Sequence, residues 1–223
     1  MFKTELHCHS KGVSTCGQVD LVGIVEKFAT AGYSTLVLTN HLSEYIYEHH
    51  NKGSWKNFVD FFVGEYEALQ ETANGKLTVL LGAELRFKET GDNDYLCFGF
   101  DKAFLLENPY LYRSSVADFH KLCQEKGYLF IQAHPFRNGM KVINPAFVDG
   151  VEVFNGHGGH DSRNEIAEAW ANKFSLLKTS GTDFHYAHAP TNGGIATDEK
   201  IQTVQQLVAV LKSGKYELIK ESF

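Results

Sequence analysis

The sequence predicts an α/β fold arranged as a TIM-like barrel, and three observations favour it. Strand-like runs alternate with amphipathic helical patterns along the whole chain. The GxGxxG sequence that an open dinucleotide-binding sheet carries after its first strand is not present. Polar residues gather at the carboxyl ends of the expected strands, where barrel enzymes have their chemistry. No repeat or linker divides the chain, so residues 1–223 are expected to form a single domain.

The helices are expected where apolar residues recur at helical spacing between capping residues. Asp20 is expected to be the N-cap of one such helix, and Gly32 is expected to end it. A longer helix is expected within residues 54–72, with Phe58 and Phe62 on one side. Three further helices are expected at residues 115–126, 161–172 and 198–213.

Short runs of β-branched, aromatic and other apolar residues supply the expected strands. They cover residues 2–9, 34–39, 77–84, 95–100, 128–133, 150–154 and 175–180, with a last short apolar run at 216–219. Because helices separate most of these strands, a parallel sheet is expected.

Composition and charge narrow the choice of partner. Apolar residues make up 43% of the chain, charged residues 22%, and the net charge is −6. This charge argues against sequence-independent binding of nucleic acid, which needs many Lys and Arg residues. It is compatible with a small anionic substrate, since a cationic pocket can form locally on an acidic protein.

The chain carries no recognisable targeting or membrane segment. The N-terminus lacks the basic region and long apolar run of a signal peptide, and no apolar stretch is long enough to span a membrane. The four cysteines contain no CxxC pair. The cytoplasm is therefore the expected location, and nothing in the sequence indicates the oligomeric state.

Two short motifs place metal-ligating side chains on one side of a strand. His7-Cys8-His9 has two imidazoles at i and i+2, and Asp183-Phe184-His185 repeats this spacing with a carboxylate and an imidazole. These groups suit a divalent zinc, manganese or iron ion. Either motif alone is also compatible with an exposed strand face, but the strand-end position of both favours a metal site.

Three more candidate ligands end other expected strands. Glu84 ends an otherwise apolar run, and a buried unpaired carboxylate is costly enough to need a cation. The alternative for Glu84 is a salt bridge to Arg86 or to a lysine. His41 and His134 also end strands, and their alternative is a core histidine hydrogen-bonded to the backbone. With these three residues, at least five strands deliver a candidate ligand to one face of the barrel.

These motifs, in this order, resemble the PHP family, named for polymerase and histidinol phosphatase. The matching segments are His7-Cys8-His9, Thr39-Asn40-His41, Gly82-Ala83-Glu84, Ala133-His134-Pro135 and Gly181-Thr182-Asp183-Phe184-His185. Residues 152–156 and 161–164 also look like segments of the small stand-alone bacterial phosphoesterases of this family. The resemblance covers nearly the whole chain.

The resemblance implies a distorted (β/α)7 barrel that binds two or three divalent metal ions. By the family pattern, a first ion would be held by His7, His9, Glu84 and Asp183, a second by Glu84 and His134, and a third by His41 and His185. The chain departs from the commonest pattern at Cys16, where many members have Asp or His, and at Asp94, where many have His. Both residues are candidate ligands, whereas Cys8 is expected to point away from the metal.

The activity implied is hydrolysis of a small phosphomonoester by a metal-activated water, with Glu84 and Asp183 at the catalytic centre. Arg137 is the first candidate to hold the phosphate, because a guanidinium binds phosphate oxygens bidentately. Arg163 and His157 are the second candidates. Several aromatic residues are expected near the pocket, where they would stack on a substrate ring or simply pack: Tyr45, Tyr47, Trp55 and Tyr186.

Three other functions remain open from the sequence. A nuclease or nucleotide phosphodiesterase is the enzymatic alternative, because the family contains both. A metal-binding module without activity is favoured by the departures at Cys16 and Asp94. A metal-dependent deaminase or amidohydrolase is less well supported. Such enzymes typically use a single Asp late in the sequence as a site residue, whereas this chain has Asp183 and His185 together.

Overall fold

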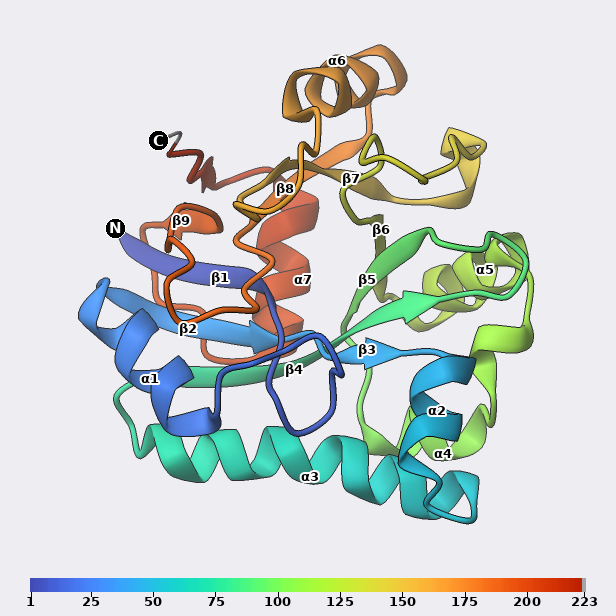
Figure 1. Ribbon diagram of the computed structural model, residues 1–223. Coiled ribbons are helices and arrows are strands. Elements are labelled where there is room, and N and C mark those ends of the chain that lie inside the picture. The colour runs from blue at the N-terminus through green and yellow to red at the C-terminus, as the bar shows by residue number, and fades with distance from the viewer. Residues whose placement is uncertain (222–223) are drawn as a thin grey trace.

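The structure is a computed structural model that describes residues 1–221 and has a mixed α/β fold (Figure 1). Its strands are β1 (Phe2–Cys8), β2 (Tyr33–Leu38), β3 (His41–Leu42), β4 (Thr78–Arg86), β5 (Asp94–Phe98), β6 (Leu129–Gln132), β7 (Gly150–Asn155), β8 (Leu177–Gly181), β9 (Ile195–Thr197) and β10 (Glu217–Leu218). Its helices are α1 (Leu21–Thr30), α2 (Glu44–His50), α3 (Trp55–Ala73), α4 (Lys102–Glu107), α5 (Val116–Lys126), α6 (Asn164–Phe174) and α7 (Val204–Ser213). Short 3-10 helices cover Leu111–Arg113 and Pro145–Phe147.

The wall of a distorted barrel is formed by β1, β2, β4, β5, β6, β7 and β8, which follow one another in the sheet. The two ends of this row approach each other where Cys8 forms a parallel bridge with Phe184, just after β8. The backbone N–H of His9 donates to the Phe184 carbonyl at 3.1 Å, and that of Phe184 donates to the His7 carbonyl at 3.1 Å. The TIM-like barrel expected from the sequence is therefore confirmed in its distorted form.

Two strands contradict the expected parallel sheet: β9 runs antiparallel to β1 and β10 beside the barrel wall, and β5 is reversed within the wall. β5 runs antiparallel to both of its neighbours, β4 and β6. The cause lies in the connection, because only residues 87–93 separate β4 from β5. A parallel crossover needs a dozen or more residues, usually including a helix.

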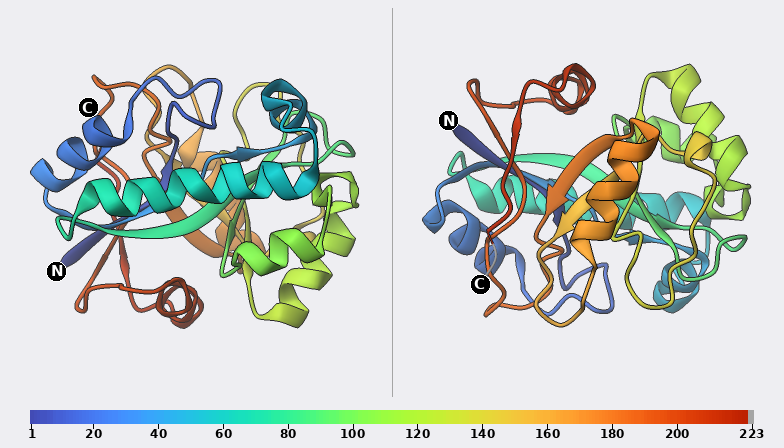
Figure 2. Two further views of the ribbon diagram at one scale, coloured as in Figure 1. Left: turned by 90° about the horizontal axis from the view of Figure 1, so that it is seen from below. Right: turned by 90° about the horizontal axis from the view of Figure 1, so that it is seen from above.

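Helices cover the outside of the barrel. α3 lies lengthwise across the sheet at β4, and α1 packs beside it (Figures 1 and 2). As expected, Asp20 caps α1 by accepting the N–H of Gly23 at 2.8 Å, and Gly32 follows the helix with a φ of +79°. Phe58 and Phe62 of α3 are buried.

The two sides of β1 have different surroundings. Leu6 belongs to an apolar cluster that includes Leu207 and Leu211 of α7. Glu5 and His7, which alternate with Leu6, are also buried, but among polar side chains within the barrel. The candidate site therefore continues the polar interior of the barrel.

Two helices begin later than the sequence indicates. α6 starts at Asn164 instead of residue 161, because the Asn164 side chain accepts the N–H of Asn155 at 3.0 Å and donates to its carbonyl at 3.2 Å. α7 starts at Val204 instead of residue 198, because Thr203 and Gln206 form a capping box there. The short elements β3, α2, α4 and β9 were not predicted.

Within residues 1–221, no helix combines the length and the apolar character that crossing a membrane requires.

Candidate metal centre

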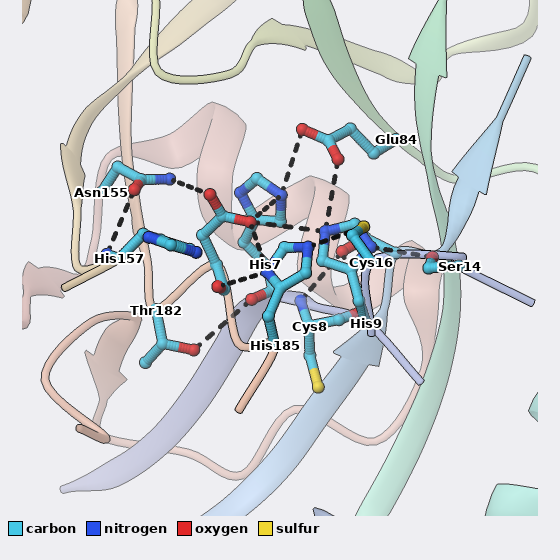
Figure 3. Close-up of polar contacts among 12 residues, drawn as sticks. His7, Cys8, His9, Ser14, Cys16, Glu84, Asn155, His157, Thr182 and His185 are labelled. Carbon is cyan, nitrogen blue, oxygen red and sulfur yellow. Dashed lines mark hydrogen bonds and ion pairs between the residues drawn. The ribbon is translucent and has the colours of Figure 1, made fainter. Parts of the chain in front are cut away.

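Seven side chains from five strand ends meet inside one end of the barrel. Figure 3 shows His7, His9, Glu84 and His185 among them. The seven are His7 in β1, His9 just after it, His41 in β3, Glu84 in β4, His134 after β6, and Asp183 and His185 after β8. Six of them are buried, and the His41 side chain is 17% exposed. These seven residues are the candidate metal ligands from the sequence that match the family pattern.

Glu84 lies at the centre of this group. Its Oε1 is 3.2 Å from His7 Nε2 and 3.1 Å from His134 Nε2. Its Oε2 is 3.2 Å from His9 Nε2 and 2.9 Å from His41 Nδ1. One carboxylate thus faces four imidazoles, whereas the salt bridge between Glu84 and Arg86 considered from the sequence does not form.

Asp183 closes the group from the opposite wall. Its Oδ1 lies 3.3 Å from His7 Nε2, 3.5 Å from His9 Nε2 and 3.3 Å from His185 Nδ1. Asp183 has a φ of +50°, in the left-handed region that non-glycine residues seldom adopt. Strain of this kind is common where a side chain must be aimed at a functional site.

Hydrogen bonds fix the proton of His9 on its Nδ1 atom. Ser14 Oγ lies 2.9 Å from Asn40 Oδ1, which already accepts the Ser10 N–H and is therefore an oxygen. Ser14 must give its only proton to this oxygen. It then accepts from His9 Nδ1, 3.0 Å away, which leaves a lone pair on His9 Nε2.

His7 and His185 have the same orientation. His7 Nδ1 lies 2.9 Å from the carboxylate of Glu152, and His185 Nδ1 lies 2.8 Å from the carbonyl of Asp183. Since both partners are acceptors, each Nδ1 carries a proton, and Nε2 is the nitrogen that can bind a metal when the ring is neutral. This pattern, with the remote nitrogen held by a carboxylate or carbonyl, is typical of histidines that ligate metals.

The cluster fits divalent cations. Nε2 of His7 and of His9 and Oε2 of Glu84 are buried, and none has a hydrogen-bond partner among the described residues. Ring nitrogens that face carboxylate oxygens across about 3 Å repel them unless a proton or a metal cation lies between the two atoms. The donor atoms also form groups of three within 4.8 Å of one another, such as His7, His9 and Glu84.

The charges of the cluster attract positive charge. Burial opposes ionisation of Glu84 and Asp183, but the neighbouring histidines outweigh it and hold both pKa values well below the usual range. Burial likewise opposes charge on His7, but Asp183, Glu152 and Glu84 outweigh it and raise its pKa well above normal. Binding of a metal would therefore displace a proton from His7.

Cys16 lies at the open side of the cluster, with its Sγ 3.1 Å from His185 Nε2 (Figure 3). Burial opposes ionisation of this thiol, but His41 outweighs it and lowers the pKa of Cys16. The Cys8 side chain points away from the cluster (Figure 3), as the sequence predicts. It packs in an apolar cluster that includes Phe28.

Asp94 is near the cluster but engaged elsewhere. Its two carboxylate oxygens accept from Arg86, at 2.7 Å from Nε and 2.6 Å from the terminal nitrogen. Oδ2 of Asp94 is 3.9 Å from His134 Nε2, and a carboxylate oxygen of Asp94 also belongs to a possible ligand group with His41 and Glu84. Asp94 can thus reach a cation only in competition with Arg86.

Arg137 and His157 line the 160 Å³ cavity above the cluster. A terminal nitrogen of Arg137 donates to Asp183 at 2.6 Å and to Asn155 at 2.8 Å, while its buried Nε has no acceptor within residues 1–221. His157 Nδ1 accepts the N–H of Gly159 at 3.0 Å, so its Nε2 carries the proton. Burial lowers the pKa of His157 to about 4, so it is a neutral hydrogen-bond donor at pH 7.

Supporting residues were missed from the sequence. Glu152 Oε2 accepts from the backbone of His134 at 3.0 Å, in addition to the bond of its Oε1 with His7. Glu5 Oε1 accepts the N–H groups of His7 at 2.7 Å and Thr182 at 2.9 Å. Like Glu84, Glu152 is a lone carboxylate in an apolar strand, and that signal was available.

Comparison with known proteins identifies the fold. No protein-family model matches the sequence, and no curated protein matches it significantly. A two-domain protein from Bacteroides vulgatus, described as containing a predicted PHP-like metal-dependent phosphoesterase, is 17% identical with a TM-score of 0.70. The match covers 99% of this chain and 65% of the Bacteroides chain.

Two further solved structures share the fold at lower similarity. The lesion-specific endonuclease PfuEndoQ from Pyrococcus furiosus is 14% identical with a TM-score of 0.59, over 97% of this chain and 57% of its own. An amidohydrolase from Chromobacterium violaceum, solved with bound sulfate, is 14% identical with a TM-score of 0.58, over 94% of this chain and 96% of its own. The fold is thus shared by proteins described as phosphoesterase, endonuclease and amidohydrolase.

Proposed function

We propose that this chain is a metal-dependent phosphoesterase of the PHP type that hydrolyses a small phosphomonoester. The proposal rests chiefly on the buried Nε2 atoms of His7 and His9, which have no hydrogen-bond partner within residues 1–221 and face the carboxylates of Glu84 and Asp183. The protein described as containing a PHP-like phosphoesterase has the same fold and supports the reaction class.

Two or three ions of zinc, manganese or iron would be held by this cluster. In our assignment the first ion takes His7, His9, Glu84 and Asp183, the second Glu84 and His134 with Asp94, and the third His41, His185 and Cys16. The second ion would have the fewest available ligands, because Asp94 is already paired with Arg86.

Such ions, when bound, lower the pKa of water from ~16 toward ~7 and offset the charge on phosphate oxygens. The protein supplies the rest of the catalytic environment. Arg137 presents a buried Nε–H that lacks a protein acceptor within residues 1–221, and a guanidinium suits phosphate oxygens. His157 donates from Nε2 into the same cavity, and Asp183 and Asn155 hold Arg137 in place.

A phosphomonoester is favoured over a long nucleic acid by size and charge. The cavity over the cluster has a volume of 160 Å³, and the net charge of the chain is −6. A nuclease or nucleotide phosphodiesterase remains the second candidate, because PfuEndoQ shares this fold. We propose a cytoplasmic location, because the four cysteines form no disulfide in the structure, as is usual in a reducing compartment.

The decisive experiment compares hydrolysis of an aryl monophosphate with that of the matching diester, after loading with manganese or zinc. We expect faster turnover of the monoester and none in Glu84→Gln or Asp183→Asn. The exposed Glu125→Gln serves as the matched control and should retain activity. Circular dichroism should show that all three variants are folded.

Each alternative has its own outcome. Preference for the diester would favour a nuclease or phosphodiesterase. Hydrolysis of an amide but of neither ester would favour an amidohydrolase. Bound metal without turnover of any ester or amide would favour a metal-binding module, and full activity in Glu84→Gln would refute the proposed centre.

A further inference from the structure

A second cavity opens beside the metal centre. It has a volume of 260 Å³ and shares Cys16, His41 and Arg86 with the cavity directly over the cluster. If the phosphate of a substrate binds at Arg137 and the cluster, the leaving group of that substrate would therefore lie next to this side cavity. Its remaining walls come from Tyr45 and Ile46 of α2, from Ser43, which caps this helix, and from Thr15.

The walls of the side cavity suit a flat ring. Tyr45 is 63% exposed although it is a large aromatic residue, so most of its surface is free to be covered. Ile46, its neighbour in the cavity wall, is buried and apolar. An aromatic face and an apolar wall favour an unsaturated ring over a charged or heavily hydroxylated group.

Arg86 adds directional hydrogen bonding without a net charge. Its Nε and one terminal nitrogen donate to the two oxygens of Asp94, which neutralise its charge. The side chain is 40% exposed, and its other terminal nitrogen makes no hydrogen bond within the described chain. These free donors, at the border of the two cavities, suit a neutral acceptor on the ring, such as a carbonyl oxygen or ring nitrogen.

The other aromatic candidates are not available for this task. Trp55 is buried, its Nε1 donates to the Leu105 carbonyl at 2.6 Å, and its ring packs against Tyr47 and Tyr110. Tyr186 lines the cavity over the cluster on the side of His157. Among the described residues, Tyr45 is thus the one Phe, Tyr or Trp side chain that lines the side cavity.

We propose that the side cavity holds the leaving group of the substrate and selects an aromatic or heteroaromatic phosphomonoester, with Tyr45 as the specificity-determining residue. This inference rests on the proposed phosphoesterase function. The volume of 260 Å³ is below the range of about 300–1,000 Å³ for cavities that hold drug-sized ligands, so the ring must be small.

Turnover provides the first test. KM values for phenyl phosphate and propyl phosphate are measured for the metal-loaded protein, Tyr45→Ala and Tyr45→Phe. We expect Tyr45→Ala to raise the ratio of the phenyl KM to the propyl KM about tenfold, and Tyr45→Phe to keep the original ratio. Phe174→Ala, an exposed aromatic residue of α6 outside both cavities, should leave both KM values unchanged. An unaltered ratio in Tyr45→Ala would overturn the proposal.

Binding without chemistry separates this inference from the proposed function. Calorimetry compares phenylphosphonate with methylphosphonate, neither of which is a phosphate ester. We expect the wild type to bind the phenyl compound about tenfold more tightly and Tyr45→Ala to lose this preference. If the preference is found but no ester is hydrolysed, the proposed function fails and the ring subsite stands. Equal binding of the two phosphonates overturns the subsite, even if esters are hydrolysed.

Discussion

The carboxylate of Glu152 lies 2.9 Å from Nδ1 of His7, and neither side chain reaches solvent. The contact orients the His7 ring so that Nε2 faces the cluster. The other carboxylate oxygen of Glu152 accepts the His134 N–H, so this one carboxylate positions two candidate ligands from different strands.

Glu152→Gln should weaken metal binding without removing a ligand. Loss of a carboxylate partner behind a metal-bound histidine typically costs about 10–100-fold in affinity. Competition with a fluorescent chelator measures the affinity for zinc and manganese. The exposed Glu125→Gln is the control. An unchanged affinity in Glu152→Gln would show that the contact with His7 has no role in binding.

Cys16 should make the proposed third metal site, which it forms with His41 and His185, prefer soft cations. A thiolate favours zinc and cobalt over manganese, and Cys16 lies 3.1 Å from His185 Nε2. The cobalt-loaded protein should show a near-ultraviolet thiolate-to-metal absorption band that Cys16→Ser lacks. Zinc affinity should fall by at least about tenfold, equivalent to ~1.4 kcal/mol, with little change for manganese. The same band in Cys8→Ser and its absence in Cys16→Ser would identify the ligand, whereas an identical spectrum in Cys16→Ser would exclude it.

Arg137→Lys should retain a positive charge but lose the planar guanidinium. Removing a hydrogen-bond donor to transition-state charge typically costs about 10²–10³-fold, so kcat/KM for an aryl monophosphate should fall about a hundredfold. Arg113→Lys, at an exposed ion pair with Glu44, is the matched control. Equal kcat/KM in Arg137→Lys and the wild type would remove Arg137 from the phosphate site.

Glu5 should make stability depend on pH. Burial raises its pKa from 4.5 to about 7, although hydrogen bonds from Thr182 and His7 partly oppose the shift. Because the folded state binds the proton more tightly, the stability contribution is full below pH 4.5 and is lost as the pH rises through 7. The difference in unfolding free energy between the metal-free wild type and Glu5→Gln should fall by about 3 kcal/mol across this range. A difference that is constant with pH, measured by urea unfolding, would contradict the raised pKa.

Much of the fold follows from local sequence patterns. The strands and helices with strong periodicity and caps, such as α1 behind Asp20 and α5 behind Ser115, lie close to their predicted positions. The positions of the candidate ligands were also predictable, because carboxylates and histidines that end apolar strands are costly unless they bind something. Glu84 and the motif from Asp183 to His185 are the clearest cases.

The remaining features depend on tertiary pairing. Antiparallel β5 places Arg86 directly opposite Asp94, and this register creates their ion pair. No local pattern specifies such a pairing, so the sequence instead offered Glu84 as a partner for Arg86. The short helix α2, with Tyr45 exposed beside the side cavity, owes its position to the Ser43 cap and to packing of Ile46. Short elements of this kind carry little periodicity to predict them.

The central claim is that side chains far apart in the sequence form a cage for several cations. It is tested most directly by anomalous diffraction from crystals grown with zinc or manganese. We predict at least one strong peak between Glu84, Asp183 and the Nε2 atoms of His7 and His9, and a second beside Glu84 and His134 or beside His41 and His185. Peaks only at the protein surface, or none near Glu84, would contradict the account.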